Sequence, residues 1–306
     1  MGAFEAGAGA ARRGTYSIVA RDAGSGELGV AVQSHWFSVG SLVSWAAPGV
    51  GAVATQSVVE VAHGPGVLER LRGGLDAERA LAASLETDAL SEYRQVGAVD
   101  AQGRAAAHTG AGCIAHAAHV CGEGFSCQAN MMAAEGVPDA MAAAFRAAPG
   151  DLAERLLAAL DAAEGLGGDL RGRQSAALLV APAQGEPWRT RFDLRVEDDS
   201  EPLVELRRLL ALARAYEMAD RADRLAALGE HARATELYVS ATELAPDNDE
   251  LAFWAGLGVA GSDLDAGLVL VRRAIAARSS WRVLLGRLEP GLAPTAAAVR
   301  DALERG

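Results

Sequence analysis

A strand-like run begins abruptly in Gly14-Thr15-Tyr16-Ser17-Ile18-Val19-Ala20-Arg21, directly after a Gly/Ala-rich stretch without any pattern. A second strand-like run over residues 27–34 follows a glycine-containing turn, so the two runs predict a β-hairpin. Cleavage after Gly14 would place a free α-amine on Thr15, beside its hydroxyl. An α-amine has a pKa of about 8 and a lysine amine about 10.4, so the α-amine is the better base near neutral pH. Thr15 is therefore either a catalytic nucleophile or simply a β-branched residue that starts a strand.

Blocks of strands and blocks of helices follow along the chain up to about residue 212. Further strands are predicted over residues 49–57, 95–100, 104–109, 124–131, 174–181 and 188–196. Helices are predicted over residues 66–72, 77–85, 138–148 and 152–165, with another beginning near residue 202. This order suits antiparallel sheets with helices on their faces, whereas a doubly wound fold needs strands and helices to alternate. We expect an α/β (α+β) domain over residues 15–212, preceded by a flexible extension over residues 1–14.

The remaining sequence is continuously helical in pattern. Within Ala222–Glu250, a glycine, two alanines, an aromatic residue and a final proline have the spacing of one tetratricopeptide repeat. Residues 249–259 are similar to the first helix of a second, imperfect copy. About three such repeats are normally needed to bury a continuous core. We therefore expect an all-helical, tetratricopeptide-like domain over residues 213–306 that packs on the main domain, on a second copy in a homo-oligomer, or on a partner.

The composition excludes several classes of function. The formal net charge is −12 over 306 residues, which argues against binding to nucleic acid or to an anionic membrane. All 28 basic residues are arginines, so a lysine general base or Schiff base is excluded. The three cysteines, with no recognisable signal peptide and no long apolar run, predict reduced thiols and a cytoplasmic location.

Two groups of polar residues are candidates for a substrate pocket. The glycine-rich loop ahead of residue 175 carries Asp169, Arg171 and Arg173. Either arginine could hold a substrate carboxylate in a two-pronged contact, or the loop is a helix cap with an internal Asp–Arg pair. Gln33 and Ser34 end the second strand of the hairpin, at the level where Thr15 begins the first. Asn130, in the strand predicted over residues 124–131, could add an amide to the pocket and to an oxyanion site.

A third group is rich in histidine and cysteine. Its members are His108, Cys113, His116, His119, Cys121 and Cys127. The group lacks the spacing of known zinc motifs, and buried thiols with hydrogen-bonded histidines are the more common arrangement. Cys127 has no histidine next to it in the sequence to activate it as a nucleophile. We expect no metal and no cofactor.

Five segments in order resemble a known bacterial family. They are Thr15–Asp22, Gly29–Ser34, Gly49–Gln56, Gly167–Ala177 and Asp193–Val196. Together they look like the family called domain of unknown function 1028, which is grouped with the N-terminal-nucleophile (Ntn) hydrolases. The resemblance covers residues 15 to about 212. The rest looks like the helical extension of some members, described as peptidoglycan-binding or tetratricopeptide-like.

The resemblance implies a four-layer αββα sandwich, hydrolysis of amide bonds, and Thr15 as the nucleophile. Two features depart from the family pattern. Fourteen residues precede Thr15, where members look as though they begin Met-Thr, so the Gly14–Thr15 bond is cut autocatalytically, translation starts later, or the site stays blocked. His35 also stands where the family commonly has lysine.

Two main hypotheses follow from the sequence, beside a third in which the protein is a metal-dependent hydrolase that would carry stoichiometric zinc. In the first, the protein is an amidohydrolase acting on a small amide or peptide-like substrate. Thr15 attacks, Gln33, Ser34 and Asn130 line the pocket, and Arg171 or Arg173 of the Asp169 loop holds a carboxylate. In the second, the protein is a non-catalytic binding or scaffold protein with an Ntn-like fold, and its C-terminal helices contact a protein or peptidoglycan.

Overall fold

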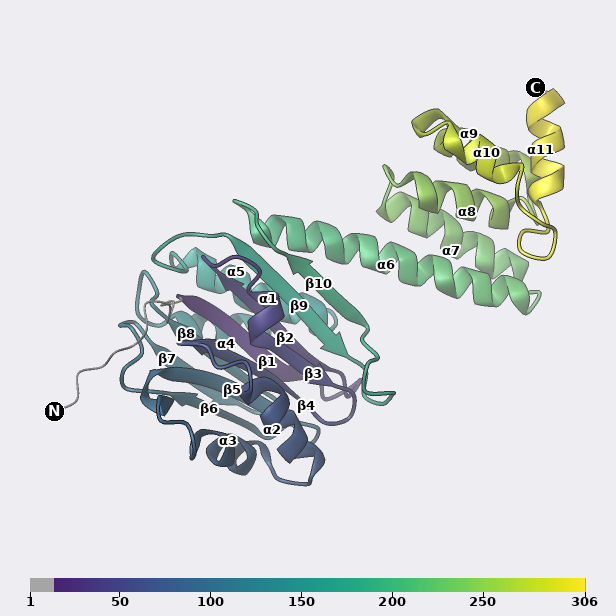
Figure 1. Cartoon of the computed structure of the whole chain (residues 1–306). Coiled ribbons are helices and arrows are strands. Elements are labelled where there is room, and N and C mark those ends of the chain that lie inside the picture. Colours follow the sequence, from purple (N-terminus) through teal and green to yellow (C-terminus); the bar gives the residue numbers. More distant parts are fainter. Residues whose placement is uncertain (1–13, 306) are drawn as a thin grey trace. The chain divides into compact units, whose positions relative to one another are not determined.

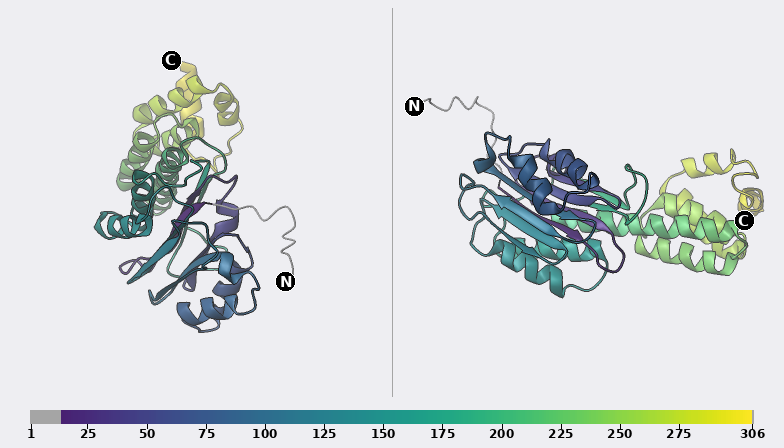
Figure 2. Two further views of the ribbon diagram at one scale, coloured as in Figure 1. Left: turned by 90° about the vertical axis from the view of Figure 1, so that its left-hand side faces the viewer. Right: turned by 90° about the horizontal axis from the view of Figure 1, so that it is seen from below.

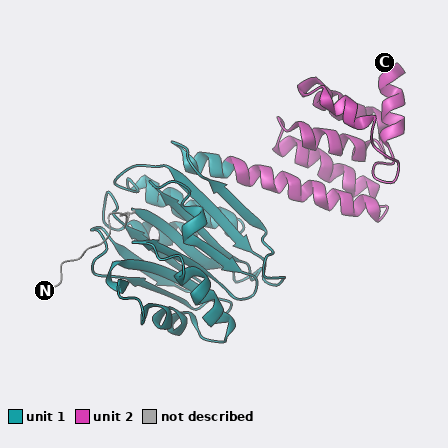
Figure 3. Cartoon of the chain, in the orientation of Figure 1, with its two compact units in different colours: residues 1–207 teal, residues 208–306 magenta. Residues whose placement is uncertain are grey.

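The computed structural model describes residues 14–305 (Figure 1). The chain divides into two compact units, residues 1–207 and residues 208–306 (Figure 3). The boundary lies within helix α6 (Pro202–Ala227), as does the division predicted at residue 212. The extension predicted over residues 1–14 lies outside the described residues, apart from Gly14.

The first unit contains two antiparallel sheets and the helices that cover them. Its strands are β1 (Thr15–Arg21), β2 (Leu28–Ser34), β3 (Ser44–Ala47), β4 (Gly51–Ser57), β5 (Arg94–Asp100), β6 (Ala105–Thr109), β7 (Ala118–Gly122), β8 (Phe125–Asn130), β9 (Ser175–Ala181) and β10 (Phe192–Val196). Its helices are α1 (Gly40–Val43), α2 (His63–Arg72), α3 (Ala77–Leu85), α4 (Val137–Ala147) and α5 (Leu152–Gly165), with a short 3-10 turn at Ser91–Tyr93. The strand orders are β10-β9-β2-β1-β8-β7 and β3-β4-β5-β6. The predicted mixed α/β class is confirmed.

The two sheets pack face to face, and helices cover their outer faces (Figures 1 and 2). Helices α4 and α5 lie on the six-stranded sheet, while α2 and α3 lie on the four-stranded sheet. The central strands are therefore buried on both faces, which explains why β1 and β2 are apolar without strict alternation. Gly29 of β2 allows α5 to approach, because a Cβ there would lie 2.7 Å from Leu156 Cδ1.

Strand β1 lies between β2 and β8, and its register aligns three polar residues. Thr15 is opposite Ser34 of β2 and opposite Asn130 of β8. These residues start or end their strands, so they meet at one edge of the six-stranded sheet. The candidate site is built at this edge.

A buried polar network fills the space between the sheets near that edge. The Ser17 hydroxyl donates to Gln56 Oε1 at 2.6 Å, and Gln128 Nε2 donates to the Ser17 hydroxyl at 2.7 Å. Gln56 Nε2 and Asn130 Nδ2 both donate to Gln95 Oε1, at 2.7 and 2.9 Å. Because each of these polar groups has a hydrogen-bond partner, burying them costs little folding free energy, and the network links the two sheets.

Four short elements differ from the sequence prediction. Helix α1 and strand β3, four residues each, were not predicted, because such lengths carry no measurable periodicity. Strand β7 is a largely exposed edge strand of small residues, so it lacks an apolar pattern. The strand predicted over residues 188–196 begins only at Phe192, and Trp188 is 78% exposed.

The second unit is entirely helical in the described residues, as predicted for the C-terminal segment. Beyond the end of α6 it contains α7 (His231–Leu244), α8 (Asp249–Val259), α9 (Leu264–Ala277), α10 (Ser280–Leu285) and α11 (Ala296–Arg305). Gly229 has a φ of 81° in the turn from α6 to α7, a conformation that favours glycine. Tyr238 of α7 donates to Asp223 of α6, and Phe253 of α8 stacks on Trp281.

None of the helices within residues 14–305 has the length and apolar character needed to span a lipid bilayer.

Candidate functional site

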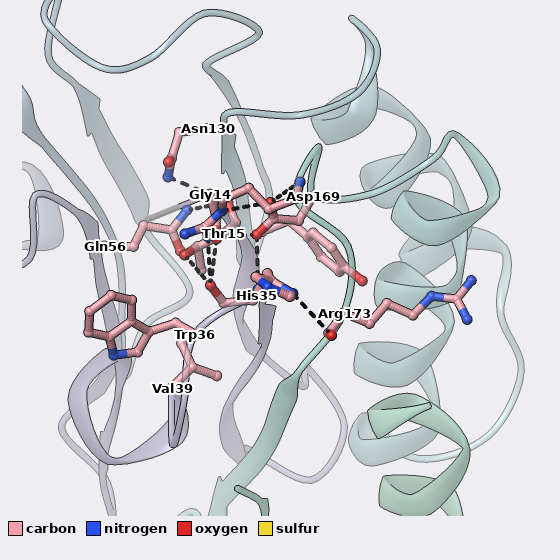
Figure 4. Close-up of polar contacts among 12 residues, drawn as sticks. Gly14, Thr15, His35, Trp36, Val39, Gln56, Asn130, Asp169 and Arg173 are labelled. Carbon is pink, nitrogen blue, oxygen red and sulfur yellow. Dashed lines mark hydrogen bonds and ion pairs between the residues drawn. The ribbon is translucent and has the colours of Figure 1, made fainter. Parts of the chain in front are cut away.

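The carbonyl oxygen of Gly14 receives two hydrogen bonds at the start of β1. The Ser34 hydroxyl donates to it at 2.5 Å, and Arg171 Nη2 donates to it at 2.8 Å. Thr15 is fully buried, and its hydroxyl donates to the Ser34 hydroxyl at 3.1 Å. The hydroxyl of Thr15 is thus linked through Ser34 to the carbonyl of the bond that precedes it (Figure 4).

The loop after α5 holds Arg171 in this position. Gly168 and Gly172, with φ of 57° and 104°, let the chain turn sharply on either side of Asp169. The Asp169 carboxylate is buried and accepts hydrogen bonds from the backbone N–H of His35 (2.9 Å) and of Arg171 (2.9 Å). Arg171 Nε and Nη2 also donate to it, at 3.1 and 2.8 Å. This planar, two-pronged contact fixes the guanidinium that reaches Gly14.

The peptide bond that follows Thr15 is held by side chains that lie between the two sheets. Gln56 Nε2 and Asn130 Nδ2 lie 3.2 and 3.4 Å from the Thr15 carbonyl oxygen and donate to it. Thr15 therefore has fixed neighbours on both of its peptide bonds. Such preorganisation is what a catalytic residue at a strand end requires.

On the helix-covered face of the sheet, Tyr16 begins a chain of charged contacts. Its hydroxyl donates to Glu164 of α5, and Arg173 Nε donates to the same carboxylate at 2.6 Å. Arg173 also pairs with Glu201. Burial of the ring, together with the charge of Glu164, raises the pKa of Tyr16 well above its usual value, so the phenol stays protonated.

The structure brings together some of the predicted site residues and separates others. Thr15, Ser34, Asp169 and Arg171 form one hydrogen-bonded group around Gly14, and Asn130 contacts the Thr15 carbonyl from the opposite side. The guanidinium of Arg173 is turned to Glu164 and Glu201. Its backbone oxygen instead lies 3.2 Å from Nδ1 of His35 (Figure 4).

Gln33 is fully buried, and its side-chain amide has no hydrogen-bond partner among the described residues. It is opposite Tyr16 in the β1–β2 ladder, so its side chain is on the face that α5 covers. It therefore lies on the other face of the sheet from the Thr15 hydroxyl. An amide buried without a partner costs about 1–3 kcal/mol of folding free energy.

Replacing Gln33 by leucine should raise the free energy of unfolding by about 1 kcal/mol, because the change removes an unpaired buried amide and keeps the volume. Gln128→Leu is the matched control. Its amide is also buried, but it is hydrogen-bonded to Ser17 and Ser126, so its loss should lower the free energy of unfolding. Urea denaturation of the two variants measures both changes. A less stable Gln33→Leu chain would mean that this amide has a partner.

The histidine and cysteine residues are dispersed over several contacts. His108 Nε2 lies 2.8 Å from the Ser91 carbonyl oxygen, and His119 Nδ1 lies 2.9 Å from the Thr109 hydroxyl. Burial raises the pKa of the Cys127 thiol, so it is protonated and a poor nucleophile. No group of three or more His, Cys, Asp or Glu side chains within residues 14–305 is arranged to hold a metal ion.

Two contributors were not predicted from the sequence as members of the site. Gln56 and Gln95 lie on the four-stranded sheet, and only the packing of one sheet on the other brings them to β1. The available signal was the placing of polar side chains in strands that are buried on both faces.

Comparison with known proteins identifies the family. The model of the "Family of unknown function (DUF1028)" matches residues 15–206, and the match therefore begins at Thr15. The crystal structure of protein SPO2555 from Silicibacter pomeroyi, of the same family, is similar with a TM-score of 0.59 and 33% sequence identity. That match covers 64% of this chain and 88% of the other. Comparison with curated proteins finds no match. The chain belongs to the family of unknown function DUF1028.

Proposed function

We propose that this protein is an N-terminal-nucleophile amidohydrolase that first cleaves its own Gly14–Thr15 bond and then hydrolyses small amide or peptide-like substrates. The observation that carries the proposal is the set of contacts on the Gly14 carbonyl. Two donors, the Ser34 hydroxyl and Arg171 Nη2, are directed at its oxygen. The Thr15 hydroxyl, the attacking group, is hydrogen-bonded to the first of them.

Apart from the water molecule used in the last step, the groups that self-cleavage needs are present around this bond. Thr15 Oγ attacks the Gly14 carbonyl carbon, while Ser34 accepts the Thr15 proton and passes its own to the Gly14 oxygen. The Arg171 guanidinium stabilises the negative charge that develops on that oxygen. The C–N bond then breaks as the proton on the Gly14 oxygen passes to the Thr15 nitrogen, and Gly14 becomes an ester of Thr15. Water hydrolyses this ester to a Gly14 carboxylate and a free Thr15.

Turnover of a substrate repeats this chemistry with a new base. The freed α-amine of Thr15, with a pKa of about 8, takes the proton from the Thr15 hydroxyl as the hydroxyl attacks the substrate carbonyl. The same two donors stabilise the oxyanion, and the leaving amine takes up the proton. Without lysine in the chain, the α-amine is the base that stands next to this hydroxyl.

The layer order of the first unit supports the assignment to the Ntn superfamily. Helices, six-stranded sheet, four-stranded sheet and helices follow one another, and the proposed nucleophile begins a central strand of one sheet. This is the arrangement expected of an αββα sandwich. The location we propose for the protein is the cytoplasm.

The second candidate is a non-catalytic binding or scaffold protein. Its support is the burial of Thr15: in a chain that is never cut, the Thr15 hydroxyl would stay closed to substrate. The helical second unit, which exposes Leu228 and Val269, would then serve for contact with a protein, with peptidoglycan or with a second copy. This candidate predicts an intact Gly14–Thr15 bond.

The mass of the purified full chain separates the two candidates. The amidohydrolase predicts that incubation near pH 8 yields a protein whose N-terminal residue is Thr15, lighter by residues 1–14. Denaturing mass spectrometry and N-terminal sequencing measure both. A chain that keeps its full mass after long incubation contradicts self-cleavage and favours the scaffold.

A further inference from the structure

We propose that the processed enzyme acts on amides whose acyl part is a glycyl residue, and that Asp169 enforces this choice. The inference rests on the proposed function, because it assigns a substrate class to the same nucleophile. It follows from the place that Gly14 occupies beside Asp169. Gly14 is the acyl group of the first bond that Thr15 would cut.

Self-cleavage and turnover pass through the same kind of intermediate. In self-cleavage, the Gly14 acyl group moves from the Thr15 nitrogen to Thr15 Oγ and forms an ester. In turnover, Thr15 Oγ attacks the substrate amide, the C–N bond breaks, the leaving amine takes the hydroxyl proton, and the substrate acyl group forms an ester with the same oxygen. For a glycyl substrate the two esters have the same atoms around the carbonyl. The surroundings of Gly14 therefore describe the acyl pocket.

These surroundings leave no space for a side chain on the acyl α-carbon. A Cβ built on Gly14 would lie 2.6 Å from Asp169 Oδ1, 2.8 Å from its Cγ and 2.9 Å from its Oδ2. Ordinary contacts of this type are about 3.5 Å or longer.

The Asp169 carboxylate is not free to move away from an added methyl group. It is buried and held by the backbone N–H groups of His35 and Arg171 and by the Arg171 side chain. Moving it would also displace Arg171, which donates to the Gly14 oxygen. A side chain on the acyl group would thus disturb the oxyanion donor as well as the pocket. Because Asp169 and Arg171 would move together, even a small steric conflict with the acyl side chain should lower the rate of hydrolysis.

The acyl group can be extended on its amino side, because Gly14 is itself joined through its nitrogen to a preceding residue. The substrate class is therefore an N-acylglycyl amide, including a peptide with glycine on the acyl side of the cleaved bond. The contacts of Gly14 describe the acyl side of the cleaved bond and do not specify the leaving amine.

The test compares two substrates that differ by one methyl group. We would prepare residues 15–306 from a fusion partner that is removed without leaving any residue before Thr15. This chain keeps every described helix and strand, since β1 begins at Thr15. We expect kcat/KM for N-acetylglycyl-p-nitroanilide to exceed that for N-acetyl-L-alanyl-p-nitroanilide by about 100-fold, because the pocket has no room for the added methyl group.

Two variants identify the cause. Asp169→Ala should raise the alanyl-to-glycyl ratio of kcat/KM even if both rates fall, because the obstructing carboxylate is gone. Thr15→Val should remove both activities, and its rate is the background to subtract. Circular dichroism of each chain checks that it is folded.

The outcomes separate the substrate class from the proposed function. Equal rates on both anilides that disappear in Thr15→Val would overturn the glycyl class and leave the nucleophile standing. No hydrolysis of either anilide by a folded chain would also overturn it. The mass of the full chain then decides independently whether Thr15 cuts the Gly14–Thr15 bond.

Discussion

The Thr15→Val chain is expected to keep the mass of the full chain and to show no amide hydrolysis. Valine has nearly the same shape as threonine and suits a β-strand, but it has no hydroxyl to attack the Gly14 carbonyl. Loss of a covalent nucleophile typically lowers the rate by about 10⁴-fold or more. Denaturing mass spectrometry during incubation near pH 8 measures the first effect. A chromogenic anilide assay on the chain that begins at residue 15 measures the second.

Thr15→Ser is the matched control for this experiment. Serine keeps the hydroxyl and its hydrogen bond to Ser34 while losing one methyl group, so self-cleavage should continue at a reduced rate. The free energy of unfolding of both variants should lie within about 2 kcal/mol of the wild-type value, since each removes one small buried group. Cleavage of the Thr15→Val chain at the same bond would show that another group attacks it, and the assignment of Thr15 would be wrong.

Much of the first unit could be predicted because its elements have strong local signals. The β1–β2 hairpin and the apolar faces of α4 and α5 are encoded in short stretches of sequence. So are the starts of α3 and α5, where the Asp76 and Asp151 side chains accept the backbone N–H of Arg79 and Glu154. Each reflects interactions within about ten residues, which patterns detect well. Edge strand β7 and the four-residue elements have few such interactions, so they were not predicted.

The site was harder to predict because it depends on contacts between distant segments. Ser34 reaches Gly14 through strand pairing, which the hairpin pattern already suggested. Arg171 reaches it from a loop more than a hundred residues away, and the sequence could not distinguish Arg171 from Arg173 as the residue that does so. Although Arg171 and Arg173 are only two residues apart, the Arg171 guanidinium contacts Gly14 and the Arg173 guanidinium contacts Glu164. The two guanidiniums are held by different carboxylates, Arg171 by Asp169 and Arg173 by Glu164 and Glu201.

The Ser34→Ala chain is expected to cut its Gly14–Thr15 bond about 100-fold more slowly than the wild type, because it loses one donor to the developing oxyanion. The same hydroxyl accepts the hydrogen bond of Thr15, so its loss also interrupts the path of the proton. Arg171 Nη2 remains as the second donor, which is why we expect slow cleavage and not its complete loss. The time course of the intact mass gives the rate constant.

Ser175→Ala separates this role from a general effect of removing a buried serine. Ser175 is opposite Ser34 on β9 and is equally buried, but its hydroxyl bonds to Trp36 and Val39 and not to Gly14. Its loss should lower the free energy of unfolding by about 1–2 kcal/mol and change the cleavage rate by only a few-fold. If both alanine variants slow cleavage equally, the effect comes from packing at this sheet edge. A hundredfold difference between two neighbouring serines would assign the effect to the hydrogen bonds that Ser34 makes with Thr15 and with the Gly14 carbonyl.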